Sequence, residues 1–311
     1  MPQMNNQQVR VIDPILTTHA RGYRHPTHVG MSLFPRAPVG VAGGQVLSFG
    51  KESFRRYNAR RAPGGNTKRI QFGYAGERYS LFQDALEGKV PREHLRDASQ
   101  TPGINLGQRA VNNVMQVLSL GLEIEQSEIA RDANRYNADH KVDLAASKWT
   151  DDANNPAKDI RTGEEAIRQS VGMAPNTLVL SAQAFAAMRE NAKVLERFKY
   201  TSSDSVTTQM IAAMLDLENV VVGKAVVAGE GDVFGDVWGT DAILAYVAPD
   251  GGAEANMEEP SYGYTYAMEG HPLVEETYYD KNAKSWIYPV TYERAPVLSG
   301  ITAGYLLRNV A

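Results

Sequence analysis

Cysteine is absent from this chain of 311 residues, which excludes disulfide bonds, thiolate metal sites and cysteine nucleophiles. Long apolar runs are absent too. No stretch approaches the roughly eighteen consecutive apolar residues of a membrane span, and the N-terminal residues lack the apolar core of a signal peptide. These absences predict a soluble product that contacts no membrane and is stabilised by packing and by partners.

Motifs for catalysis or ligand binding are scarce. The close pair His25 and His28 has a proline between its members, which does not fit helical metal-ligand spacing. The adjacent carboxylates Asp151 and Asp152, like Glu258 and Glu259, are predicted to be solvated loop charges because neighbouring side chains point apart. The sequence contains no phosphate loop, no Gly-x-Ser-x-Gly elbow and no dinucleotide fingerprint. We therefore predict no enzymatic activity, no cofactor and no metal.

Acidic residues are few in the first third of the chain. Residues 1–100 hold 15 Lys and Arg against 7 Asp and Glu, a net charge of +8, whereas residues 101–311 hold 17 against 29, a net charge of −12. A self-assembling subunit can use such a split to lay its basic part on the acidic body of a neighbour, because opposite potentials steer association. An uneven but merely solvated surface is the alternative.

Residues 1–45 are rich in Pro, Gly, Gln and Asn, and their prolines prevent long regular elements, so we predict an extended arm. Residues 46–81 contain two strand-like runs around the turn at 62–66, which predicts a long hairpin with a net charge of +6. An isolated ribbon is marginal in water, and this one has too few large apolar residues for its own core. It is therefore expected to lie on another subunit.

The side chains expected at this contact between subunits are basic and aromatic: Phe54, Arg55, Arg56, Tyr57, Arg60, Arg61, Arg69 and Phe72. Such a ribbon could instead bind nucleic acid by stacking on bases and neutralising phosphates. The acidic isoelectric point of the whole chain, near 5.9, favours the protein contact.

A long helix is predicted over residues 105–136. Its apolar face comprises Val111, Val114, Met115, Leu118, Leu122 and Ile129, and its polar side comprises Gln108, Asn112, Gln116, Glu123 and Arg131. An α/β unit follows, with helices or strands at residues 156–171, 177–180, 182–190, 207–215 and 220–222. Strands are then predicted at residues 242–247, 262–268, 273–279, 285–292 and 301–309.

This order of elements, an α+β arrangement, resembles the major capsid proteins of tailed bacteriophages and herpesviruses, whose fold encapsulins share. Local similarity to phage major capsid proteins includes NTLVL at 176–180, KVLER at 193–197, ENVVVG at 218–223, VWGTD at 237–241 and YGYTY at 262–266. The resemblance implies five parts: an N-terminal arm at 1–45, an E-loop at 46–81, a peripheral domain at 82–150 that includes the spine helix at 105–136, an axial domain at 151–241, and a second peripheral part of antiparallel strands at 242–311.

The resemblance also implies a function. Copies of the chain would form hexamers and pentamers that close into an icosahedral head around double-stranded DNA bound without sequence specificity. A separate scaffold protein and a portal would take part, and assembly in the host cytoplasm would place the product in the virion. The alternatives are an encapsulin-type nanocompartment shell and, with no motif in its favour, a soluble α/β hydrolase.

Overall fold

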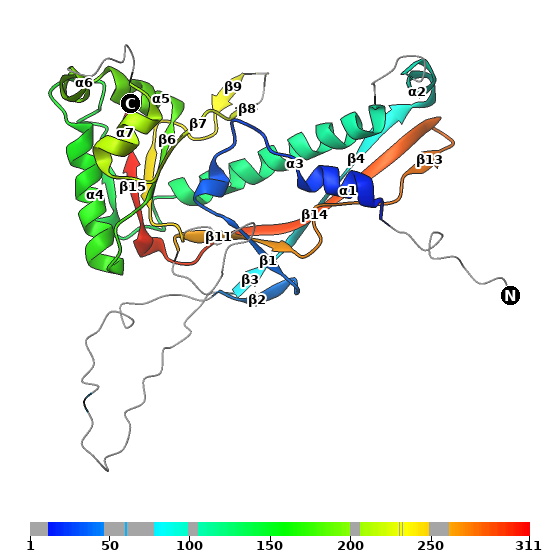
Figure 1. Cartoon of the computed structure of the whole chain (residues 1–311), viewed down its shortest axis with the longest axis horizontal. Coiled ribbons are helices and arrows are strands. Elements are labelled where there is room, and N and C mark those ends of the chain that lie inside the picture. Colours follow the sequence, from blue (N-terminus) through cyan, green and yellow to red (C-terminus); the bar gives the residue numbers. More distant parts are fainter. Residues whose placement is uncertain are drawn as a thin grey trace.

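The computed structural model describes residues 12–46, 60, 78–98, 105–199, 206–229, 231, 233–248 and 261–311. Two sheets and one long helix organise this part of the chain. Helix α3 (Leu106–Arg131) runs beside a long, narrow sheet and ends at a second, compact sheet that carries most of the other helices (Figure 1). No helix among the described residues is long and apolar enough to cross a membrane.

The long sheet is built around β14 (Ser285–Leu298). Strand β4 (Phe82–Pro91) pairs with it in antiparallel register over ten residues, from Ser285↔Pro91 to Arg294↔Phe82. The other edge of β14 pairs with three strands, namely β11 (Gly263–Met268), β12 (Leu273–Val274) and β13 (Tyr278–Asp280). Strand β1 (Arg36–Val39) then joins β11 in parallel.

Most of the predicted apolar face of α3 packs on this sheet. Val111, Val114 and Leu118 are buried against Val290 and Tyr292 of β14. The helix begins at the predicted place, where the Asn105 side chain accepts a hydrogen bond from the Gln108 amide. It ends five residues before the predicted end. The Asp132 side chain accepts from the Asn134 amide, and this local bond competes with continuation of the helix.

The compact sheet has the order β5 (Lys141–Asp143), β15 (Gly304–Arg308), β10 (Ala242–Ala245), β6 (Thr177–Ser181) and β7 (Asn219–Gly223). Its strands alternate between two cores. Leu178 and Leu180 face the core under the helices, whereas Val179 faces a core shared with α3 and the N-terminal segment. Burial on both faces explains why the central strands β6 and β10 carry apolar residues on both sides.

The helices of this unit are α4 (Pro156–Val171), α5 (Ala182–Glu190), α6 (Ala192–Phe198) and α7 (Thr208–Leu215). Helix α4 ends where predicted, at Gly172, whose φ of 78° lies in the left-handed region. The prediction missed α6. Asn191 ends α5 and its side chain caps α6 by accepting from the Lys193 amide, so two helices meet at one residue.

Two predictions about residues 242–311 need correction. The structure places β10 and β15 in the compact sheet with β6 rather than among the antiparallel strands of the long sheet. The expected single strand at 273–279 is two short strands, β12 and β13. Pairing partners far away in sequence decide both points, and strand propensity does not contain this information.

The predicted arm has more regular structure than expected from residue 12 onward. It contains α1 (Pro14–Arg21), capped by the Asp13 side chain, and two short strands, β1 and β2 (Gly43–Gln45). None of these elements exceeds eight residues, as its prolines predicted. Helix α1 packs its buried Leu16 and Ala20 against α3, so this segment belongs to the body.

Four short strands and helices remain to be placed. Strand β3 (Arg78–Ser80) pairs with β2, α2 (Arg92–Ala98) follows β4 at the far end of the long sheet, and β8 (Val226–Ala228) forms a ribbon with β9 (Phe234–Asp236). Figure 1 shows the β8–β9 ribbon above the junction of α3 with the compact sheet.

Two helical glycines allow a test of this packing. An ideal Cβ on Gly163 of α4 would lie 2.7 Å from the buried Tyr305 ring, whereas one on Gly121 of α3 would meet only the Arg294 guanidinium at 3.6 Å. Gly163→Ala should therefore lower the free energy of unfolding by about 1–3 kcal/mol. Gly121→Ala should raise it by up to about 1 kcal/mol through helix propensity. Urea unfolding of unassembled subunits measures both, and a gain in both variants would contradict the described α4–β15 contact.

Candidate assembly interface

Most residues predicted for the contact between subunits lie outside the described part of the chain: Phe54, Arg55, Arg56, Tyr57, Arg61, Arg69 and Phe72. Arg60 is described and is exposed. The role of these side chains therefore stays a prediction. What the structure describes is the place where the two flanks of residues 47–77 meet.

That place is the antiparallel pair β2–β3, with Gly43 opposite Ser80 and Gln45 opposite Arg78. The pairing brings the two ends of the predicted hairpin together, as a hairpin requires. The Tyr79 ring stacks on the Tyr266 ring of β11 with centroids 4.5 Å apart, which fastens the base of the hairpin to the long sheet. Burial raises the pKa of Tyr266 to about 12, so its hydroxyl stays protonated at neutral pH.

Beside this base, α3 and β4 enclose a groove of about 410 Å³. Leu86 and Val117 line it and are 41% and 58% exposed, and Phe82 at the start of β4 is 71% exposed. The outer edge of β4 pairs with no strand in the described part of the chain. Exposed apolar groups next to an open strand edge are typical of surfaces that another protein covers.

Arg294 of β14 forms the floor of this groove. Its side chain is 2% exposed and bonds to Asp84 of β4 at 2.9 Å and to Glu125 of α3 at 2.7 Å. A third bond goes to the Leu118 carbonyl oxygen of α3 at 3.2 Å. One guanidinium group thus ties the three elements that shape the groove, and the half-exposed carboxylates leave the wall acidic.

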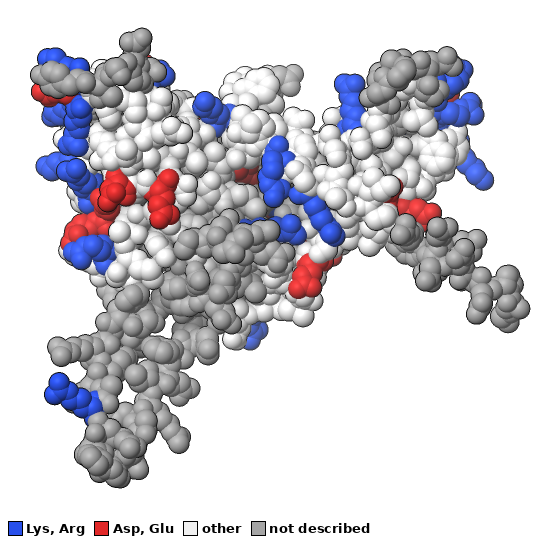
Figure 2. All heavy atoms as spheres, viewed as in Figure 1, with Lys and Arg blue, Asp and Glu red and all other residues white. Residues whose placement is uncertain are grey.

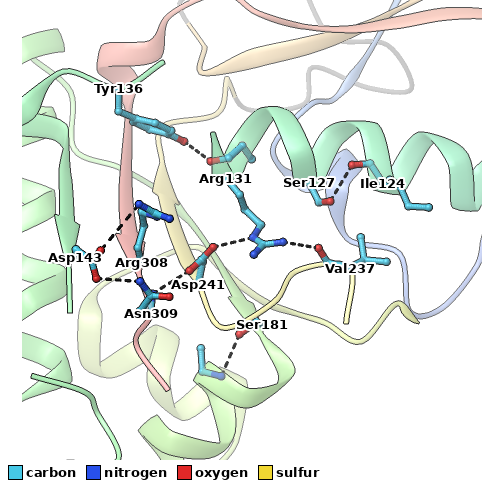
Figure 3. Close-up of polar contacts among 12 residues, drawn as sticks. Ile124, Ser127, Arg131, Tyr136, Asp143, Ser181, Val237, Asp241, Arg308 and Asn309 are labelled. Carbon is cyan, nitrogen blue, oxygen red and sulfur yellow. Dashed lines mark hydrogen bonds and ion pairs between the residues drawn. The ribbon is translucent and has the colours of Figure 1, made fainter. Parts of the chain in front are cut away.

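A second ion pair joins α3 to the compact sheet (Figure 3). Arg131 Nε donates to Asp241 Oδ2 at 2.7 Å, and its Nη1 donates to the Val237 carbonyl at 2.9 Å. Asp241 Oδ1 also accepts from the Asn309 amide near the end of β15. Gly239, with a φ of 54°, lies against the guanidinium group, and a Cβ there would come within 2.3 Å of Arg131 Nη2.

Glu123 was predicted to lie on the polar side of the long helix, but it is buried. It is 1% exposed and accepts hydrogen bonds from the Val29 and Gly30 amides at 2.8 and 2.9 Å and from Trp238 Nε1 at 2.7 Å. Burial raises the pKa of this carboxyl, and the three donors oppose that rise. Glu123 thus joins the N-terminal segment, α3 and a loop of the compact unit, a role that helical periodicity could not reveal.

The features considered for chemistry have structural roles where they are described. Asp151 Oδ1 accepts from the Ala153 amide within a turn, and Asp152 Oδ1 accepts from the Ala192 amide at the start of α6. The His25 and His28 rings lie 4.3 Å apart. Within the described ranges, no cluster of three His, Asp or Glu side chains is arranged to hold a metal ion. Glu258 and Glu259 lie outside those ranges.

Comparisons with known proteins agree with this architecture. Residues 126–288 match the family model of phage major capsid protein E. The major capsid protein of Burkholderia phage BcepMu is 33% identical over 305 residues, covering 97% of this chain and 98% of the relative. A phage-related protein from Bordetella bronchiseptica RB50 has 54% sequence identity and a TM-score of 0.84, with coverage of 97% and 98%. The capsid structure of cyanophage P-SCSP1u has a TM-score of 0.56 at 8% identity, with coverage of 92% and 89%.

The fold is thus the mixed helix-and-sheet fold of tailed-phage capsid shells, and the predicted fold class is confirmed. The chain belongs to the phage major capsid protein family. It is a structural subunit of the capsid shell and a component of the virion. These matches favour the phage coat protein over the encapsulin-type alternative.

Replacing Arg294 tests the joint beneath the groove. Arg294→Met should lower the free energy of unfolding by about 2–3 kcal/mol, less than a fully buried pair would lose, because water can reach Asp84 and Glu125. Arg135→Met is the control, since its pair with Asp132 is exposed and should contribute no more than about 0.5 kcal/mol. Chemical denaturation of unassembled subunits compares them, and equal losses would show that Arg294 does not act as a joint.

His28 should make the folded subunit less stable at acidic pH. Burial, with a smaller contribution from the nearby His25, lowers the pKa of His28 from 6.5 to about 4 in the folded chain. Between these values the unfolded chain binds a proton that the folded chain does not, so stability should fall as the pH drops from about 6.5 to about 4. His28→Gln should lose less stability over this interval. Thermal unfolding midpoints at several pH values measure the difference, and parallel curves would refute the assignment.

Proposed function

We propose that copies of this chain assemble through head-to-tail contacts into hexamers and pentamers, which close into an icosahedral head around double-stranded DNA. The observation that carries the proposal is the pairing of β2 with β3. It brings the two ends of a segment with strong positive charge to one point at the edge of an acidic body. Two different surfaces that meet head to tail generate rings when the rotation between successive copies closes.

The basic ribbon at 46–81 would serve as the E-loop and lie on a neighbouring copy. The groove between α3 and β4 suits it in shape and in charge. Asp84 and Glu125 offer carboxylates to the ribbon's arginines, and Leu86 and Val117 offer apolar contact to its aromatic side chains. The ribbon of one copy would meet the groove of the next, so the two surfaces in contact are different.

The remaining parts follow the same proposal. The compact unit would be the axial domain, with the predicted range 151–241 enlarged by β5, β10 and β15, because these strands complete its sheet. The long sheet and α3 would form the peripheral domain, and residues 1–45 the N-terminal arm. A separate scaffold protein and a portal would act during assembly in the host cytoplasm, and the shell would carry out no catalytic step.

Charge reversal in the ribbon tests the proposal. Arg55→Glu, Arg56→Glu and Arg60→Glu together should leave the subunit folded and prevent shell formation, because the ribbon would then meet an acidic groove with like charge. Negative-stain electron microscopy detects the particles, and circular dichroism with thermal unfolding verifies the fold.

The matched control replaces the same three arginines with lysine, which keeps the positive charge, and it should still form particles. Normal particles from the glutamate variant would refute the contact assigned to the ribbon. Loss of particles in both variants, with both folded, would mean that geometry rather than charge governs the contact.

A further inference from the structure

A cavity of about 280 Å³ lies between α3 and the segment that follows α1. Its wall includes Arg21, Arg24 and Arg36 together with His25 and His28. Figure 2 shows a group of Lys and Arg side chains on the face crossed by α1 and the segment after it. Neither the E-loop contact nor the joints around Glu123 and Arg131 uses these arginines.

Among the described residues, the partners of these three guanidinium groups are backbone carbonyl oxygens. Arg21 donates to the carbonyl oxygens of Gly270 and Pro272, and Arg36 donates to that of His271. Arg24 donates through Nη1 to the carbonyl oxygens of Arg21 and Tyr23. None of the ion pairs in the described ranges involves these three arginines. An arginine has five N–H donors, so much of their donor capacity is free.

The cavity therefore has an excess of positive charge. Glu123 is the acidic residue in its wall, and both of its carboxylate oxygens already accept hydrogen bonds from protein donors. Even with Glu123 ionised, the three arginines leave a net charge of about +2 at one small cavity. Clustered like charges repel, so this arrangement favours a bound anion.

We propose that this cavity binds a phosphate group. A tetrahedral phosphate presents oxygens in several directions and can accept from three guanidinium groups that approach from different elements, whereas a carboxylate presents two oxygens in one plane. Its charge also matches the excess. The group could come from free inorganic phosphate or from the backbone of packaged nucleic acid. The second source rests on the proposed function and requires no contact with bases.

Arg24→Gln is the best test, because Arg24 is exposed and its bonds within the described residues go to the nearby carbonyls of Arg21 and Tyr23, so the fold should be unchanged. Arg197→Gln removes the same charge from an exposed position on α6 and serves as the matched control. Arg21→Lys, which keeps the charge but loses the planar fork, provides a second probe of the cavity. Thermal unfolding confirms that each variant is folded.

Two ligands distinguish the sources. Isothermal titration of unassembled subunits with inorganic phosphate should give an affinity at least about tenfold weaker in Arg24→Gln than in the unaltered chain or Arg197→Gln. Fluorescence anisotropy with a short DNA duplex should show a salt dependence whose log–log slope is shallower by about one in Arg24→Gln. A change with phosphate but none with the duplex would assign the site to free phosphate.

Unchanged binding of both ligands in Arg24→Gln and Arg21→Lys would overturn the proposal. So would a variant that fails to assemble while its phosphate affinity is unaltered, since the cluster would then bind a carboxylate of a neighbouring copy. Arg24→Gln should form normal particles. In the glutamate variant of the ribbon, substitution of Arg24 should still weaken phosphate binding. The two outcomes separate failure of this site from failure of the assembly proposal.

Discussion

The buried carboxylate of Glu123 is the contact on which the arrangement of the subunit depends. It lies in the middle of α3 and accepts hydrogen bonds from residues 94 and 115 positions away, Val29 on one side and Trp238 on the other. Burying an ionisable group is costly unless its hydrogen-bonding capacity is filled. Here two backbone amides and an indole fill it, so the N-terminal segment and the compact unit are both fixed relative to the helix. Gly30 permits the approach, because a Cβ there would come within 2.9 Å of Glu123 Oε2.

Arg131 and Arg294 also link separate elements of the subunit through polar side-chain bonds. Each guanidinium group leaves one element and bonds to carboxylates or carbonyls of others, Arg131 at the compact sheet and Arg294 beneath the groove. Such pairs contribute less to stability than apolar packing of equal volume, but their directional bonds admit few alternative arrangements. Apolar cores alone would let the two sheets shift relative to α3. A shell subunit repeats its geometry in every copy, so small shifts would accumulate around a ring.

Local signals in the sequence were sufficient for three of the four helices of the compact unit, α4, α5 and α7. Gly172 ends α4 with a left-handed φ, and the Ser181 and Thr207 side chains cap the helices that follow them. The fold class followed from the order of such elements. Sheet membership did not, because β10 and β15 are placed by strands that lie far away in sequence. The burial of Glu123 was missed for the same reason: its partners belong to other elements, and an amphipathic pattern assigns a glutamate to the solvent side.

The charge split in the sequence now divides into surfaces. Of the net +8 in residues 1–100, the arm at 1–45 carries +3 and the ribbon at 46–81 carries +6, while residues 82–100 are at −1. Most of the ribbon's charge belongs, in sequence, to the segment between β2 and β3, which we propose lies on an acidic neighbour. Arg21, Arg24 and Arg36 of the arm instead line the cavity between α3 and the segment that follows α1. A single partner for the basic residues 1–100 would not explain this separation, because side chains that bind one partner are expected on one continuous surface. The two proposed anionic partners, an extended protein surface for the ribbon and a phosphate group for the cavity, would account for this separation.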